Sequence, residues 1–351
     1  MKKVVLMLSA AAALAACSKN EVVPATVAGD AEITWLTAPK SKAIADSDPR
    51  TDFSHDNVFA SYAYALKKDE TWAANYATAE PYITGATISY VNDVWKNADA
   101  KYFWPKEGSL TFFAWSINDA NLDAYKSAVS CTQEDGIKAN LDVVANKNVD
   151  FMVADMQADK TAGVATYDHN GVPTLFRHRL SDIVFKVRTD KDYSANKTIV
   201  LNYIKFTGIA SQGEYSQLVS GGDDQKIAAD ASSKKEQSYL PDSDNAQEVK
   251  SGEYQSVANV DQYLYLPQKF VEGEAKLIVG YTVMTKKEYT GGDKNYTEKL
   301  EQTIDLKDLF ASWEMGKRYT FNLSFSLDEI LWDPAVENWE DVASGDILIE
   351  Q

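Results

Sequence analysis

Cysteine, histidine and long apolar runs are scarce in this 351-residue chain. Its only cysteines are Cys17 and Cys131, and Cys17 lies close to the N-terminus. The body of the chain therefore holds a single thiol and cannot form an internal disulfide, so its fold must rest on a hydrophobic core. After the first residues no segment is apolar for long enough to cross a bilayer as a helix.

Recognisable catalytic and cofactor motifs are missing as well. His55, His169 and His178 do not share metal-ligand spacing, and the flanks of His178 indicate a packed, structural histidine. The residues around Cys131 are polar and acidic, whereas a reactive thiol needs a basic setting. The chain has no glycine-rich phosphate loop and no nucleophile elbow. We therefore predict no enzymatic activity, no metal and no cofactor.

Basic residues are also fewer than acidic ones. The chain has 35 basic and 52 acidic residues, a formal net charge of −17. This charge opposes binding to nucleic acid, and it suits a soluble exported surface. Four aspartates gather at Asp46, Asp48, Asp52 and Asp56 without the central glycine and terminal glutamate of a calcium loop. We interpret them as a solvated acidic loop, with a weak cation site as the alternative.

The N-terminus has the layout of a bacterial lipoprotein leader. Lys2 and Lys3 precede a short apolar run over residues 4–16, which ends in Leu14-Ala15-Ala16-Cys17. This pattern predicts a signal peptide over residues 1–17, cut before Cys17, with lipid (palmitate) attached to that cysteine. The alternative is an ordinary secretory leader with a chance cysteine. The prediction makes the protein an exported lipoprotein of the outer membrane and cell surface.

The body of the chain is expected to be all-β. Apolar and polar residues alternate with a period of two over residues 319–327, 183–187 and 277–283, and further strands are expected at 110–114 and 58–66. Helical periodicity is limited to residues 121–129 and 308–313. Residues 212–261 are expected to form a polar loop, and Thr290-Gly291-Gly292-Asp293 a hairpin tip. Many short strands separated by turns favour antiparallel sandwiches.

Aromatic residues are abundant, with 8 Trp and 19 Tyr. Most fall at alternating strand positions, where they fill a core. Trp72, Trp95 and Trp104 have no obvious core position, and exposed aromatics could form a platform for sugar rings. A surface lipoprotein that binds glycan for nutrient capture is therefore the alternative function.

Several segments in order resemble the fimbrillin family, the Mfa-like and fimbrillin-like lipoproteins of type V pili. The resemblance rests on Tyr102-Phe103-Trp104-Pro105 with Gly108 and residues 110–115, on residues 176–183, on residues 204–209 with Gly213 and Tyr215, on Leu266-Pro267-Gln268, and on Trp313 with residues 316–319. It covers residues 32–339, almost the whole exported chain.

The resemblance implies two tandem transthyretin-like antiparallel β-sandwich domains. Together with the change in composition between the two halves, it predicts three units. These are a propeptide-like segment over residues 18–50, which includes a first strand, an N-terminal domain over residues 51–165 and a C-terminal domain over residues 174–351. The function it implies is that of a pilin, the structural subunit of an adhesive pilus (fimbria). Its partners would be other pilin subunits in a head-to-tail polymer, the outer membrane through the N-terminal lipid, and a host or bacterial surface ligand.

Assembly in this family is expected to use strand exchange, in which protease cleavage removes the first strand and a neighbouring subunit donates another. Residues 32–37 are expected to form that first strand, and the bond between Arg50 and Thr51 is the candidate cleavage site, with Lys40 and Lys42 as alternatives. Ile347, Leu348 and Ile349 are the candidate donor strand. The opposing interpretation is that Arg50 is an ordinary loop residue and the terminal strand pairs within its own sheet.

Overall fold

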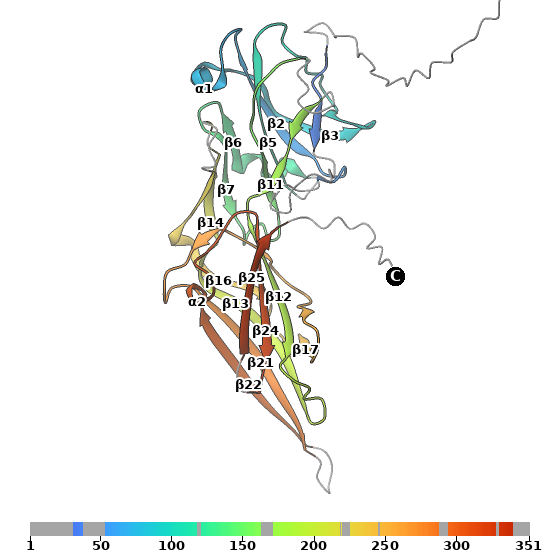
Figure 1. The fold of residues 1–351 in the computed structure, drawn as a ribbon, viewed down its shortest axis with the longest axis vertical. Helices are drawn as coiled ribbons and strands as arrows, with labels where there is room; N and C mark the ends of the chain where they lie inside the picture. Colours follow the sequence, from blue (N-terminus) through green and yellow to red (C-terminus); the bar gives the residue numbers. More distant parts are fainter. Residues whose placement is uncertain are drawn as a thin grey trace, which may run out of the picture.

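The computed structural model describes residues 31–37, 53–117, 121–162, 171–217, 219, 225–244, 246–287, 294–327 and 330–339. Within these ranges the regular structure is mostly β-strand, arranged in two parts along one long axis (Figure 1). The all-β sandwich class expected from the alternation is confirmed. No helix in the described part of the chain is long and apolar enough to cross a membrane.

A nine-stranded sheet dominates the first part. Its strands follow the order β10-β1-β4-β3-β2-β5-β8-β11, and β9 pairs with β5. The strands are β1 (Trp35–Thr37), β2 (Phe59–Leu66), β3 (Glu80–Val91), β4 (Val94–Asn97), β5 (Ser109–Ile117), β8 (Phe151–Ala154), β9 (Gln157–Lys160), β10 (Val172–Thr174) and β11 (Phe176–His178). Because β10 and β11 are separated only by Leu175, one continuous stretch of chain supplies both ends of the sheet.

The two faces of this sheet carry separate cores. One face encloses an aromatic cluster that includes Trp35, Phe59, Trp95, Phe112 and Phe176. The other face packs on a four-stranded sheet in the order β15-β14-β7-β6. That sheet consists of β6 (Val129–Thr132), β7 (Gly136–Asp142), β14 (Gln212–Ser216) and β15 (Lys226–Ala229), and short helices α1 (Trp72–Asn75), η1 (Tyr76–Thr78) and η2 (Leu122–Ala128) lie in this part of the chain.

The second part is a sandwich of two five-stranded sheets around one core. One sheet contains β12 (Ser181–Thr189), β18 (Gln255–Ser256), β19 (Leu264–Tyr265), β24 (Lys317–Phe325) and β25 (Ile330–Asn338). The other contains β13 (Lys197–Ala210), β16 (Lys234–Leu240), β17 (Gln247–Val249), β21 (Lys276–Lys287) and β22 (Lys294–Asp305). The small pair β20 (Gln268–Lys269) and β23 (Ser312–Trp313) and the short helices η3 (Ala231–Ser233) and α2 (Leu306–Leu309) complete it.

The segments in which apolar and polar residues alternate form strands, and their apolar side chains face the core, as the period of two predicts. Phe185 on β12 and Phe321 on β24 stack with ring centroids 4.5 Å apart at the centre of the sandwich core. Strands β21 and β22 pair over their whole length as the expected hairpin, although residues 290–293 lie outside the described residues. Among the described strands all pairs are antiparallel except β1 with β10 and β12 with β24.

Two expectations from the sequence are wrong. The helix expected over residues 308–313 lies instead at Leu306–Leu309 (α2), where the Asp305 side chain caps it, and the buried Trp313 belongs to β23. Residues 212–261 are not one polar loop, because they contain the five strands β14 to β18. Few residues of these strands are buried, and most of their side chains are polar. The alternation of apolar and polar residues that marks a strand is therefore not visible in this part of the sequence.

Chain segments after residue 171 pair with strands of the first part. β11 joins β8, and β14 joins β7 directly after the buried Ser211, which follows the end of β13 at Ala210. The chain thus crosses between the two parts three times: from β11 to β12, from β13 to β14, and from β15 through η3 to β16. The division into domains over 51–165 and 174–351 stays a prediction.

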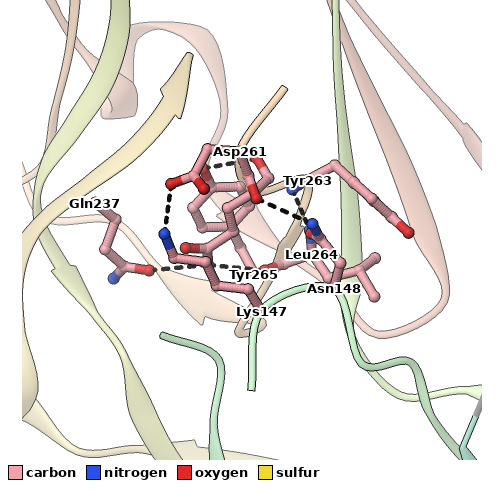
Figure 2. Close-up of polar contacts among 8 residues, drawn as sticks. Lys147, Asn148, Gln237, Asp261, Tyr263, Leu264 and Tyr265 are labelled. Carbon is pink, nitrogen blue, oxygen red and sulfur yellow. Dashed lines mark hydrogen bonds and ion pairs between the residues drawn. The ribbon is translucent and has the colours of Figure 1, made fainter. Parts of the chain in front are cut away.

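A polar network also ties the two parts together (Figure 2). The Asn148 side chain donates to the Asp261 carbonyl at 3.0 Å and accepts from the backbone N–H of Tyr263 at 2.8 Å. Lys147 forms an ion pair with Asp261 at 2.5 Å. Because the Asn148 side chain hydrogen-bonds to backbone groups of the second part, it fixes the position of one part against the other.

Candidate functional site

The first strand, β1, sits inside its sheet rather than at the edge. Ile33, Trp35 and Thr37 are all buried, whereas Thr34 and Leu36 between them are partly exposed. This alternation follows from the period of two of an extended chain, which directs every second side chain to the core. Residues 31–37 therefore contribute three side chains to the core of the first part, and we call the position that they occupy the β1 seat.

Backbone hydrogen bonds hold β1 on both sides. It runs parallel to β10, where Val172 N–H donates to the Thr34 carbonyl at 2.8 Å, and antiparallel to β4 at Trp35. Before it, Ile33 N–H donates to the Tyr102 carbonyl at 2.7 Å. Among the described strands β10 pairs with β1 alone, so departure of β1 would leave backbone groups of β10 and β4 without their partners.

Trp35 is the largest side chain in the β1 seat. It is 3 % exposed and packs edge-on against Phe59 and Phe112, each with ring centroids 6.4 Å from it. Its indole N–H donates to the Ser61 hydroxyl at 3.1 Å. Ser61 lies on the central strand β2 and is fully buried, so the indole reaches across the core to meet it.

Gly171 lets β10 approach β1 closely. A β-carbon at this position would lie 2.9 Å from the carbonyl carbon of Trp35, which is closer than real β-carbons come to other atoms. β1 can therefore occupy its seat only because residue 171 has no side chain. Any larger residue there must push β1 and the start of β10 apart.

The chain has five arginines, and four of them are built into the fold. These four lie in or beside described strands and contact Asp155 (Arg177), the Val153 carbonyl (Arg179), the Tyr254 ring (Arg188) and Asp182 (Arg318). Arg50 and Thr51 lie outside the described residues. Arg50 is thus the one arginine between β1 and the rest of the protein, and the only one that lies outside the described residues.

The C-terminal end of the described chain is anchored beside β11. Trp339 is buried and stacks on His178 with ring centroids 3.6 Å apart. His178 in turn bonds through Nδ1 to an oxygen of Asp150 at 2.7 Å, so it is a packed histidine, as the sequence indicates. Ile347, Leu348 and Ile349, like Cys17, lie outside the described residues.

The other candidate reactive residues are placed in structural settings. Burial raises the pKa of the Cys131 thiol to about 12, so the thiol keeps its proton at neutral pH and is not a nucleophile. His55 stacks on Tyr90 at the surface. His169, Asp46, Asp48 and Asp52 lie outside the described residues. Within the described ranges no group of three or more His, Cys, Asp or Glu side chains could hold a metal ion.

All eight tryptophans belong to the described residues, and none is exposed. Trp72 and Trp95 are buried, and Trp104 is partly buried against Phe112. The Trp72 indole N–H donates to the Val219 carbonyl at 3.1 Å. The three tryptophans without an obvious role are thus core residues, and the tryptophans do not form the exposed row that a sugar platform needs.

One solved fimbrial protein shares this architecture. The structure is similar to a fimbrial protein from Bacteroides vulgatus, with a TM-score of 0.62, 17 % identity, and coverage of 80 % of this chain and 92 % of that one. The tip fimbrial protein Mfa3 from Porphyromonas gingivalis, solved with a C-terminal truncation, matches with a TM-score of 0.33, 13 % identity, and coverage of 81 % and 93 %. No curated protein sequence matches.

These features define an all-β protein with two sandwich-like parts and an internal first strand. A family model described as fimbrillin-like matches residues 45–339, and the chain belongs to that family. The resemblance seen in the sequence is thereby confirmed.

Sequence reasoning missed three parts of the site. Ser61 and Gly171 gave no signal, because each acts through a contact with a residue far away in the sequence. The third is β10, which lies in a stretch interpreted as a boundary because of Gly171 and Pro173. The buried triplet Val172–Thr174 could have indicated a strand, yet its parallel partner β1 could not be read from local sequence.

Proposed function

We propose that this protein is a pilin, a structural and non-enzymatic subunit of an adhesive pilus anchored in the outer membrane. Membership of the fimbrillin-like family supports a role as a pilus or adhesion subunit at the cell surface. A lipid on Cys17 anchors the subunit before assembly, and the acidic exported surface keeps it soluble.

Polymerisation proceeds by exchange of the first strand. An arginine-specific protease cuts between Arg50 and Thr51, β1 leaves, and a strand from a neighbouring subunit pairs with β10 and β4 in its place. Ile347, Leu348 and Ile349 form the strand that this chain donates in turn. Each contact is head-to-tail and does not close on itself, so it produces a fibre.

One observation carries the proposal: β1 is buried between β10 and β4, yet it is joined to the rest of the protein only through the segment that contains Arg50. A single cut in that segment separates a core strand from its domain. The remaining arginines all contact partners within the fold, which favours cleavage at one position.

The test is to treat the purified chain with an arginine-specific protease and to follow its mass and oligomeric size. Loss of all residues up to Arg50, together with growth of oligomers, is the expected result. Arg50→Lys is the matched control, because it keeps the charge but removes the recognised residue, and it should stay intact and monomeric. A cleaved chain that remains a monomer, whether or not residues 347–351 are deleted, contradicts the proposal.

A further inference from the structure

The middle position of the β1 seat has a shape that few side chains match. Trp35 fills it, with Phe59 and Phe112 as walls, and the buried Ser61 hydroxyl accepts the indole N–H at 3.1 Å. Once β1 leaves, this position becomes a space of indole size with a buried hydroxyl beside it. A smaller apolar side chain would leave part of that space empty and would offer Ser61 no donor.

The chain's own C-terminus matches this seat only at its beginning. Aligned with residues 31–37, residues 345–351 repeat the order small, acidic, isoleucine, with Ile347 in the place of Ile33. The next inward position, taken by Trp35 in the seat, is Ile349 in the C-terminal segment. Residues 340–351 contain no aromatic residue, so no shift of register brings one to this position.

We propose that the β1 seat prefers a donor strand from a different subunit to one from a second copy of this chain. The preferred strand carries an aliphatic residue, then a tryptophan two residues later, then a small hydroxyl residue two further on, as Ile33, Trp35 and Thr37 do. Ser61 is the specificity-determining residue for the tryptophan. This inference rests on the proposed strand exchange and adds the chemistry of the partner.

A competition between peptides tests the selection. The protease-cleaved chain is incubated with an equimolar mixture of two synthetic peptides, one with the sequence of residues 31–37 and one with that of residues 345–351. Native mass spectrometry then measures the fraction of the chain that carries each. The first peptide should be bound about a hundredfold more tightly, since a tryptophan-sized cavity is costly. The Ile349→Trp form of the second peptide should recover most of that difference.

Ser61→Ala in the chain provides the residue-specific control. It should reduce the preference for tryptophan by roughly fivefold, the value of one neutral hydrogen bond, and leave binding of the unaltered C-terminal peptide unchanged. Equal binding of the two original peptides overturns the selection and leaves strand exchange standing. If the chain is cleaved after Arg50 and binds neither peptide, both the selection and the exchange are overturned.

Discussion

At the scale of single residues, stability depends on large aromatic side chains at the centres of the cores. Phe321 is 1 % exposed and contacts Phe185, Phe206 and Phe310. We expect Phe321→Ala to lower the free energy of unfolding by about 3–5 kcal/mol, because the truncation leaves a cavity that the two sheets cannot close. Denaturant unfolding measures the change. Val336→Ala on the exposed face of β25 is the control and should change stability little.

A buried tyrosine gives the protein a dependence on alkaline pH. Burial raises the pKa of Tyr215 to about 12, and its hydroxyl bonds Gln225 at 3.0 Å. Between about pH 10 and 12 the unfolded phenol loses its proton while the folded one keeps it. The folded state then binds more protons, so the free energy of unfolding falls as the pH rises, by up to about 1.4 kcal/mol per pH unit from this group.

Comparison with Tyr215→Phe isolates that contribution. At pH 8 the variant should be less stable by about 1 kcal/mol, the value of the lost hydrogen bond. Between pH 10 and 11 the difference in the free energy of unfolding between the two proteins should narrow by about 1 kcal/mol, because only the original protein carries the phenol of Tyr215. Urea unfolding at a series of pH values tests this, and a difference that stays constant with pH would contradict it.

At the scale of the element, the β1 seat depends on the close approach of β10. Gly171→Ala forces a β-carbon against the Trp35 backbone, and we expect it to weaken the pairing of β1 with β10 by about 1–3 kcal/mol. Hydrogen exchange of the Val172 amide, which donates to Thr34, should become faster. Exchange in β21 serves as the internal reference and should not change. Unaltered protection at Val172 would show that β1 tolerates the added carbon.

At the scale of the whole molecule, the junction between the two parts is held by Asn148 more than by Lys147. Asn148 bonds backbone groups of the other part, whereas the ion pair of Lys147 with Asp261 is partly exposed and contributes little. Asn148→Gly keeps the left-handed backbone that residue 148 adopts, at φ 58°, and removes only the side chain. It should lower the free energy of unfolding by about 1–3 kcal/mol.

Lys147→Met is the paired control, and it should change stability by less than about 1 kcal/mol. Circular dichroism during urea unfolding measures both variants. Equal effects of the two substitutions would mean that the exposed ion pair, and not the amide, holds the junction.

The proposed membrane anchoring of the whole molecule depends on one residue, Cys17. Cys17→Ala should leave an unprocessed precursor without lipid, because the leader pattern requires cysteine at the cleavage point. Labelling with palmitate and membrane fractionation check this. A variant that still takes up the label and sediments with the membrane would show that the lipid is attached elsewhere.

The sequence by itself determined the strands with the clearest alternation and which of their side chains face inward. Tyr319, Phe321, Leu323 and Phe325 are buried on β24 as their alternation indicates, because a period of two is a local property of an extended chain. The order of the family's short motifs likewise identified the family before any contact was known. The candidate residues at Cys17, Arg50 and 347–349 come from sequence alone and remain predictions.

Only the tertiary structure decided which strands pair and which side chains the β1 seat accepts. The parallel pairing of β1 with β10, the pairing of β14 with β7, and the contact of Trp35 with Ser61 join residues 26 to 137 positions apart in the chain. Strand alternation specifies a face but not a partner, since every strand edge offers the same backbone groups. The partner is selected by packing across the core, a property of the assembled fold and not of any one segment.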